Sequence, residues 1–352
     1  MNRKASFFVV ATLVMFITVL APLFTLSAWL TSKPVWIFLL AALVLSIPAF
    51  YSCWYSLNSS NNMRIRWLWM QALGLGTVLL LLVVLGSFFT IRANPRDIGL
   101  VVLFAWPVLS AAAIWQAINI KTRHLRIEAN QLSTPVRLVQ ISDVHIGSRS
   151  AEFLDKVVAK VNKHQPDLVL ITGDLLDSST VSATDMAALA KITCPTYMCI
   201  GNHERYVDLD KALADISTHG VLVLRDEIVV TNGIQIIGVD DRDKPDALPS
   251  VLDALAINEN CFSVLLYHRP DGWQAALDKG IDLTLAGHTH AGQMFPFGLL
   301  VRRQYPNMAG LFKKEGRSLF VSTGTGTWGP VFRLGTRSEL TVIDLDNESD
   351  LI

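Results

Sequence analysis

Side chains that bind metal ions recur along this 352-residue chain after its first third. In order, they are Asp143, His145, Asp174, Asn202, His203, Glu204, His268, His288 and His290. Carboxylate, amide and imidazole groups together suit a divalent transition metal such as manganese, iron or zinc. The series contains no cysteine, so a structural zinc site held by thiolates is not indicated. The residue types therefore predict a site for divalent cations.

The blocks of polar residues directly follow apolar stretches that are typical of buried strands. These stretches are Val136–Ser142, Asp167–Thr172, Thr196–Ile200, Phe262–Tyr267 and Ile281–Ala286. Strand ends of an α/β sheet gather at one edge, which is where such folds place their sites. We therefore expect residues that are distant in sequence to converge on one spot.

The elements around these strands indicate an α/β fold. Ala151–His164 has apolar residues at helical spacing, so strand, helix and strand form a βαβ unit with a right-handed crossover. Further strands are expected at His124–Glu128, Gly233–Val239, Ser318–Ser322 and Glu339–Leu345, and helices at Thr184–Lys191, Leu209–His219, Pro249–Ile257 and Pro270–Lys279. Helices separate the later strands less regularly than the first ones. A sandwich of two mixed sheets flanked by helices fits this order better than a plain doubly wound sheet.

The first third of the chain is apolar enough to enter a membrane. Four runs contain no Lys, Arg, Asp or Glu: Phe7–Leu30, Val35–Tyr55, Trp67–Thr90 and Ile98–Ile118. Each reaches the roughly 20 residues that a helix needs to cross a bilayer. Without ionisable groups in the spans, an anchor or helical bundle is favoured over a transporter or channel, including a transporter regulated by its soluble domain. We expect a membrane region with four transmembrane helices at 1–120, a linker at 121–135 and the soluble domain at 136–352.

Charge and cysteine content indicate where the soluble domain lies. One side of the spans carries Arg3, Lys4, Arg64, Arg66, Lys121, Arg123 and Arg126, and the other carries Lys33, Arg92 and Arg96. The positive-inside rule then predicts a multi-pass protein of the inner (cytoplasmic) membrane, with the soluble domain in the cytoplasm. The four cysteines show no regular spacing, which fits a reducing compartment. The formal net charge is zero, so bulk electrostatics predict no nucleic-acid partner.

The ordered blocks D-x-H, G-D, G-N-H-[DE], H and G-H-x-H resemble the calcineurin-like metallophosphoesterase family. The resemblance covers the chain from about Val136 to its end, and all five blocks are present without substitution. Val139–Gly147, Pro166–Leu176, Gly287–Gln293 and Gly324–Pro330 make the chain similar to a membrane-associated bacterial branch of that family. The resemblance implies the metallophosphoesterase-type sandwich of two mixed sheets.

The resemblance also implies a centre with two divalent metal ions, manganese first and iron or zinc as alternatives. Asp143, His145 and His290 would hold the first metal, Asn202, His268 and His288 the second, and Asp174 would bridge them. One residue separates Asp143 from His145. Their side chains can therefore face the same metal only if the strand stays extended or turns just there.

The other implied roles concern proton transfer and substrate. His203 would protonate the leaving group or stabilise the transition state, and Glu204 would orient His203 and favour its charged form. Arg149 and Arg333 are minority candidates for contacts with the substrate. Outside the blocks, hydrogen-bonded structural roles are expected for His124, His164 and His219, whereas Asp177 is a candidate support for the ligands.

The function that these observations favour is a membrane-anchored phosphoesterase, in which a metal-bound hydroxide attacks phosphorus directly. The resemblance leaves monoesters, diesters (as for a phosphodiesterase) and pyrophosphates open. The membrane region favours a phosphorylated lipid over a small molecule, and relatives with a similar core cleave the lipid- and nucleotide-linked UDP-diacylglucosamine. The alternative is a non-catalytic membrane scaffold or sensor with an inactive phosphoesterase domain, which the complete ligand set disfavours.

One stretch has two open interpretations. Phe295–Val301 is apolar and precedes Arg302 and Arg303. It either packs in the core or dips into the membrane interface, where basic residues attract anionic lipid.

Overall fold

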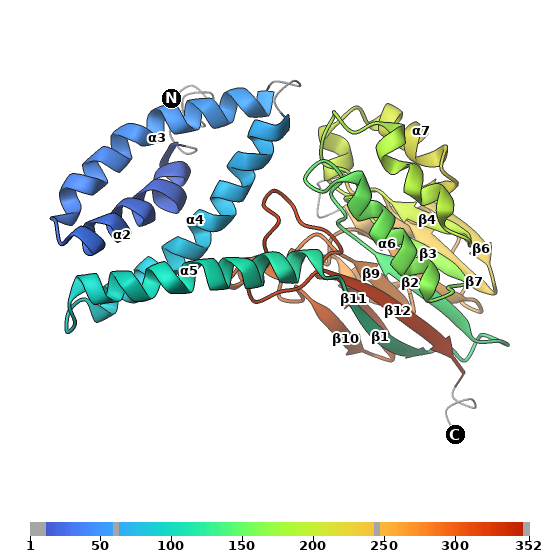
Figure 1. Ribbon diagram of the computed structural model, residues 1–352. Helices are drawn as coiled ribbons and strands as arrows, with labels where there is room; N and C mark the ends of the chain where they lie inside the picture. The colour runs from blue at the N-terminus through green and yellow to red at the C-terminus, as the bar shows by residue number, and fades with distance from the viewer. Residues whose placement is uncertain (1–11, 59–62, 243–246, 348–352) are drawn as a thin grey trace. The chain divides into compact units, whose positions relative to one another are not determined.

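The computed structural model describes residues 12–58, 63–242 and 247–347, shown in Figure 1. The chain divides into two compact units, which we describe separately. One is helical and comprises Met1–Trp115 with Gly329–Phe332. The other comprises Gln116–Trp328 with Arg333–Ile352 and contains every strand among the described residues.

The helical unit has four helical segments long and apolar enough to cross a membrane. They are Thr12–Thr31, Val35–Ser52, Trp67–Phe89 and Pro95–Ile118. The first segment includes η1 (Phe16–Leu20) and α2 (Ala21–Thr31), and the others lie in α3 (Val35–Asn58), α4 (Met63–Phe89) and α5 (Pro95–Ile118). These spans confirm the four predicted runs, except that Phe7–Ala11 of the first run lies outside the described residues. Helices this apolar on all sides are typical of membrane spans.

The second unit is a sandwich of two six-stranded sheets, as predicted. The first sheet has the order β1 (Lys121–Glu128), β12 (Glu339–Asp346), β2 (Val136–Ile141), β3 (Leu168–Thr172), β4 (Thr196–Cys199) and β5 (Val221–Leu224). The second has the order β10 (Gly310–Lys314), β11 (Arg317–Val321), β9 (Leu283–Ala286), β8 (Phe262–Leu266), β7 (Ile234–Gly238) and β6 (Glu227–Thr231). Both are mixed, because β12 runs antiparallel to β2, and β10 and β6 run antiparallel to their neighbours.

Alternating side chains on the central strands build the core on both faces of each sheet. On β3, Leu168 and Leu170 fill the space between the two sheets, whereas Val169 and Ile171 face the helices. In sequence order the helices of this unit are α6 (Ala151–Lys163), η3 (Ala183–Lys191), η4 (His203–Tyr206), α7 (Leu209–Ser217), α8 (Ala247–Ala254), α9 (Trp273–Asp278), η5 (His290–Gly292) and α10 (Gly298–Gln304). α6 and α7 cover the first sheet (Figure 1), together with η3, and α8 and α9 pack on the second. Burial on both faces explains why β3 is a continuous apolar run.

The interval 121–135, which we expected to be a linker, begins with β1. Its residues pair in parallel with β12, from Lys121 opposite Glu339 to Glu128 opposite Asp346. Arg123 also forms an ion pair with Glu339 across this pairing, with 3.0 Å between Nε and Oε2. The first sheet therefore starts two residues after the last apolar helix ends.

Candidate metal centre

The ends of five strands bring the predicted ligands together. Asp143, Asp174 and Asn202 follow β2, β3 and β4 of the first sheet, and His268 and His288 follow β8 and β9 of the second. Potential ligand atoms form three groups: Asp143, His145 and His290; His145, Asp174 and His203; and Asp174, His268 and His288. Within each group these atoms lie within 4.8 Å of one another. Shared members make the three groups one continuous site.

The backbone at these strand ends turns sharply, which answers the question about Asp143 and His145. Both residues have positive φ angles, 53° and 55°, and so do Asp174, His288 and His290. A left-handed conformation costs a residue with a Cβ roughly 1–2 kcal/mol. Such strain gathers at functional sites, where the surrounding structure imposes it. The strand therefore turns at the D-x-H block, and this turn lets both side chains point into one site.

Two glycines allow the turns after β3 and β4 to approach each other. Gly173 has a φ of 82°, and a Cβ on it would lie 2.6 Å from the Gly201 nitrogen. A Cβ on Gly201 would lie 2.2 Å from Oδ1 of Asp174. These clashes explain why a glycine precedes both Asp174 and Asn202.

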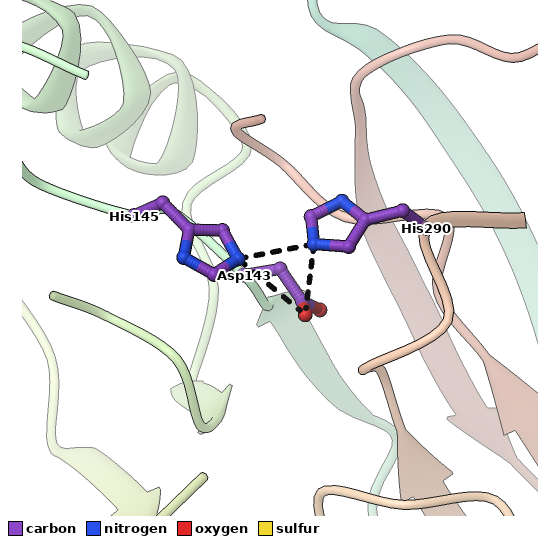
Figure 2. Close-up of side chains that lie close together, drawn as sticks. All are labelled: Asp143, His145 and His290. Carbon is purple, nitrogen blue, oxygen red and sulfur yellow. Dashed lines mark hydrogen bonds and ion pairs between the residues drawn. The ribbon is translucent and has the colours of Figure 1, made fainter. Parts of the chain in front are cut away.

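The first half of the site is formed by Asp143, His145 and His290, whose side chains converge in Figure 2. The two Nε2 atoms of His145 and His290 are 3.0 Å apart. Oδ1 of Asp143 lies 3.4 Å from Nε2 of His290 and 4.0 Å from Nε2 of His145. All three side chains are buried or nearly so.

The second half is formed around Asp174. Its Oδ2 lies 3.1 Å from Nε2 of His268 and 4.0 Å from Nε2 of His145, so this carboxylate stands between the two halves. Nδ1 of His288 is 3.2 Å from Nε2 of His268. The amide oxygen of Asn202 is buried and has no hydrogen-bond partner among the described residues. A buried acceptor without a hydrogen-bond partner fits the ligand role predicted for Asn202.

The donor spacing fits divalent cations. Ligand atoms about 2.1 Å from a metal and at adjacent coordination positions lie roughly 3.0–3.4 Å apart. The nitrogen–nitrogen and nitrogen–oxygen contacts of 3.0, 3.4, 3.1 and 3.2 Å fall in that range. The two separations from Nε2 of His145 to Asp143 and Asp174 are longer, at 4.0 Å.

Neighbouring polar groups fix the orientation of the ligands, as is usual around metal sites. The Asp143 carboxylate accepts hydrogen bonds from the Ser142 hydroxyl, at 2.5 Å, and from the His288 backbone N–H, at 3.0 Å. Nδ1 of His268 lies 2.7 Å from the Thr172 carbonyl oxygen, which leaves Nε2 directed at Asp174. Behind His145, a carboxylate oxygen of Asp177 lies 3.6 Å from Nδ1, as expected for a supporting residue.

Burial and close charges set the protonation of the site. The Asp174 pKa is lowered despite its burial, because the His268 imidazolium stands beside it. Burial alone would lower the His268 pKa, but the Asp174 charge outweighs it and raises that pKa to about 10. Burial raises the Asp143 pKa to about 6 and lowers those of His145 and His288 to about 3. Most ligand imidazoles are therefore neutral, as metal binding requires, whereas His268 carries a proton.

This proton predicts that metal binding depends on pH. A cation that takes Nε2 of His268 must displace the proton, so between about pH 6 and 10 affinity should rise about tenfold per pH unit. Below about pH 6, Asp143 is protonated as well, and the dependence should steepen. Calorimetric Mn²⁺ titrations at pH 7.5, in two buffers of different ionisation enthalpy, measure proton release. Equal apparent enthalpies in both buffers would show that no proton leaves.

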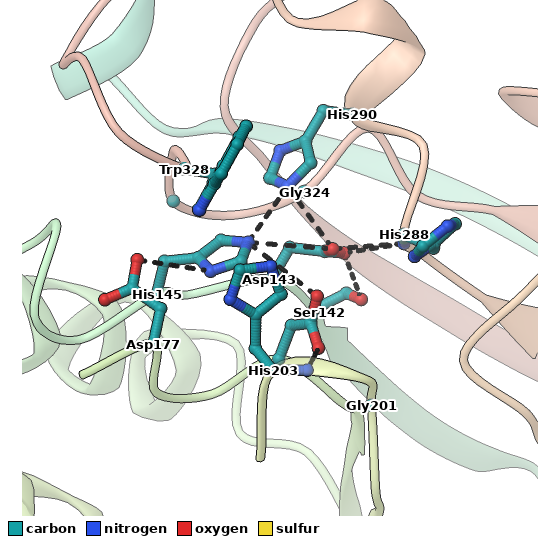
Figure 3. A network of polar contacts seen from close by, with 12 residues as sticks. Ser142, Asp143, His145, Asp177, Gly201, His203, His288, His290, Gly324 and Trp328 are labelled. Atoms are coloured by element: carbon teal, nitrogen blue, oxygen red, sulfur yellow. Dashed lines mark hydrogen bonds and ion pairs between the residues drawn. The ribbon is translucent and has the colours of Figure 1, made fainter. Parts of the chain in front are cut away.

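His203 lies beside the metal ligands without being enclosed by them. Its ring packs edge-on against His145, with centroids 4.7 Å apart, and lies 5.9 Å from the Trp328 ring (Figure 3). Its backbone N–H donates to Oδ1 of Asp174 at 2.9 Å. Nδ1 has no hydrogen-bond partner among the described residues, and burial lowers the His203 pKa. The ring is thus packed against one predicted ligand, and its backbone is tied to another.

Glu204 makes contacts that differ from the expected one with His203. Its buried carboxylate accepts hydrogen bonds from four backbone N–H groups, those of Asp174, Leu175, Leu176 and Gly201, at 2.7–3.2 Å. Burial raises the Glu204 pKa to about 7, whereas four N–H donors favour the ionised carboxylate. Glu204 therefore fixes the turns that carry Asp174 and Asn202.

The two arginine candidates are both buried. Arg333 is fully buried, and one of its terminal nitrogens lies 3.1 Å from Nδ1 of His290 and 2.7 Å from the Gly326 carbonyl oxygen. These contacts place Arg333 behind a ligand, not toward solvent, so we do not carry it forward as a substrate contact. The Arg149 guanidinium stacks 3.7 Å above the Phe153 ring and lies 3.5 Å from the Thr327 hydroxyl.

Several side chains at the site have no signal in the sequence. The Tyr305 hydroxyl lies 3.1 Å from Nε2 of His288, and the Tyr206 hydroxyl accepts a hydrogen bond from the Asn202 amide nitrogen at 3.1 Å. The second contact holds the amide nitrogen of Asn202 and leaves its amide oxygen without a hydrogen-bond partner among the described residues. Arg269, next to His268, pairs with the buried Asp241 at 2.8 Å.

Comparison with known proteins supplies the context for this geometry. Residues 136–292 match the model of a family described as Calcineurin-like phosphoesterase. An uncharacterized metallophosphoesterase of Campylobacter jejuni is 33% identical over 258 residues, which cover 68% of this chain and 68% of the relative. An uncharacterized metallophosphoesterase of Helicobacter pylori is 33% identical over 64% of each chain. A "transmembrane protein with metallophosphoesterase domain" from Danio rerio is 32% identical over 60% of this chain and 53% of the relative. The chain thus spans less than two thirds of the length of the last two.

Proposed function

Because the chain belongs to the calcineurin-like metallophosphoesterase family, we propose that it is a membrane-anchored phosphoester hydrolase with a two-metal centre. The observation that carries this proposal is the arrangement of two ligand groups on either side of Asp174. Asp143, His145 and His290 would hold one cation, and Asn202, His268 and His288 the other, with Asp174 bridging. Four helices apolar enough to span a membrane precede this domain.

The ligand charges suit a phosphorylated substrate. Two divalent cations, when bound, polarise phosphoryl oxygens and activate a water for direct attack on phosphorus. Asp143 and Asp174 are the only acidic residues in the proposed ligand set, and Asn202 and the imidazoles are neutral ligands. Two divalent cations held by only two carboxylates would therefore leave a net positive charge at the site, and this charge attracts the phosphate.

His203 is the residue that we assign to the leaving group. Burial lowers its pKa in the free site, which alone would disfavour a proton donor. A bound phosphate is negative and raises the pKa of a neighbouring imidazole, so His203 gains its proton as substrate binds. Under this assignment, the acid that protonates the departing oxygen is charged only in the complex.

The proposal also covers the membrane in which the protein lies, its substrate class and its metal. The basic residues around the spans support an inner-membrane protein with its catalytic domain in the cytoplasm. A lipid-linked phosphoester or pyrophosphate, the latter as in UDP-diacylglucosamine, is the substrate class that a membrane location favours over a soluble nucleotide or monoester. Manganese is the cation proposed first, since the ligand set mixes oxygen and nitrogen donors.

Removing and restoring the metal tests the activity. After treatment with a chelator, the full chain in detergent should lose hydrolysis of bis-p-nitrophenyl phosphate and p-nitrophenyl phosphate, and Mn²⁺ should restore it. Calcium, which prefers more oxygen ligands, is the control cation and should not restore activity. A protein that binds Mn²⁺ yet hydrolyses neither substrate would favour the scaffold or sensor alternative.

A further inference from the structure

The surface helix α10 presents apolar side chains to the outside of the domain. Phe295, Phe297, Leu299 and Leu300, which we call the apolar rim, are 50%, 44%, 63% and 64% exposed. α10 spans seven residues, all of them described, and none is buried. This outcome decides between the two interpretations of the stretch, because Phe295–Val301 does not pack in the core. A helix that contributes nothing to its own domain's core calls for another partner.

Basic residues share the face of α10 that carries the leucines. Arg302 and Arg303 lie three and four positions after Leu299, which places them beside it on the helix surface. Both are exposed. From Ala291 to Lys314 the sequence has four basic residues and no acidic one, although the whole chain has a formal net charge of zero. An apolar face edged by long basic side chains is the pattern of helices that lie in the interface of an anionic membrane.

Both ends of α10 are attached to residues of the metal centre. At its start, a Cβ on Gly292 would lie 2.3 Å from the Gly298 nitrogen, so the helix packs backbone to backbone on η5, which begins with His290. At its end, Tyr305 contacts Nε2 of His288 through its hydroxyl, at 3.1 Å. The Gln293 side chain also hydrogen-bonds both the N–H and the carbonyl of Trp328, whose ring lies beside His203. The helix that carries the apolar rim is thus joined at both ends to residues of the metal centre.

We infer that the apolar rim, with Arg302 and Arg303, is a docking surface for an anionic lipid bilayer. The same chain carries four candidate spans, and two residues separate the last of them from β1, so a bilayer is the partner always within reach. Docking would set the metal centre at headgroup level. That last consequence rests on the proposed function, whereas the docking surface does not.

Site-specific photo-crosslinking tests the surface without depending on catalysis. Benzoylphenylalanine replaces Leu300, or Leu299 in a second variant, in the full chain reconstituted in nanodiscs of phosphatidylcholine and phosphatidylglycerol. The matched control replaces Val230, which is 68% exposed on β6, the edge strand opposite β10 in the second sheet. Lipid adducts at positions 299 and 300 should exceed those at position 230 by about tenfold. Neutralising Arg302 and Arg303 with glutamine should lower the phosphatidylglycerol adducts about fivefold per residue.

Two outcomes would overturn the inference: equal adducts at positions 300 and 230, or adducts at positions 299 and 300 that join two copies of the chain instead of lipid. Hydrolysis of soluble bis-p-nitrophenyl phosphate by the same samples separates this result from the proposed function. Adducts without hydrolysis would leave the docking surface and reject the enzyme. Hydrolysis without adducts would keep the enzyme and reject the docking surface.

Discussion

Replacing Asp174 by asparagine is expected to remove metal from both halves of the centre and to lower hydrolysis by about 10³-fold or more. Asp174 faces His268 at 3.1 Å and His145 at 4.0 Å, so the two halves share its charge. Asparagine keeps the size of the side chain but brings neutral atoms among buried ring nitrogens. Metal content by mass spectrometry and turnover of bis-p-nitrophenyl phosphate with Mn²⁺ measure the two effects.

Asp167→Asn is the matched control for this variant. Asp167 precedes β3 at its other end, where its carboxylate accepts a hydrogen bond from the Arg137 backbone N–H at 2.7 Å. The same substitution there should leave metal content and turnover near those of the wild type. Equal activity in Asp174→Asn and the wild type would reject the two-metal hydrolase. Lost activity with full metal content would instead remove Asp174 from the ligand set.

The sequence could predict that the five blocks converge, because the strand ends of an α/β sheet gather at one edge. Burial on both faces of the central strands made β2, β3 and β8 visible as apolar runs, and each polar residue that follows such a run must lie near the sheet edge. The same rule could not predict the left-handed turns at Asp143 and His145. Those conformations depend on the fit between loops, such as the contact between Gly173 and Gly201.

For the same reason, the sequence could not predict side-chain contacts between residues that are distant in the chain. Tyr305 ends a short exposed helix and Arg333 lies in an irregular loop, and neither position has a periodic pattern that marks it. The strands β5, β6 and β10 were missed because they are short or lie at sheet edges, with weak burial patterns. The interval 121–135 posed a different problem. The polar alternation of β1 suggested a strand, but its pairing with β12 needs a partner more than 200 residues away.

His203→Ala should lower turnover by about 10²–10⁴-fold, the range of general acid–base catalysis, while metal content stays unchanged. Metal retention is expected because His203 is not in the proposed ligand set and all seven proposed ligand side chains remain. A more specific test is how the loss of turnover depends on the leaving group. A p-nitrophenolate departs with little protonation, whereas phenolate needs a proton. The loss should therefore be larger for phenyl phosphate esters than for p-nitrophenyl esters.

The matched control for this variant is His219→Ala, because Nε2 of His219 lies 2.7 Å from the Ala183 carbonyl oxygen and the ring belongs to none of the ligand groups. It should leave turnover and leaving-group dependence intact. An equal loss for both esters in His203→Ala would assign the ring to transition-state binding, and loss of metal would make it a ligand, as its grouping with His145 and Asp174 permits. The pH profile discriminates further. If substrate supplies the charge that protonates His203, the basic limb of kcat should lie at higher pH than that of kcat/KM, because burial lowers the His203 pKa in the free site and the bound phosphate raises it.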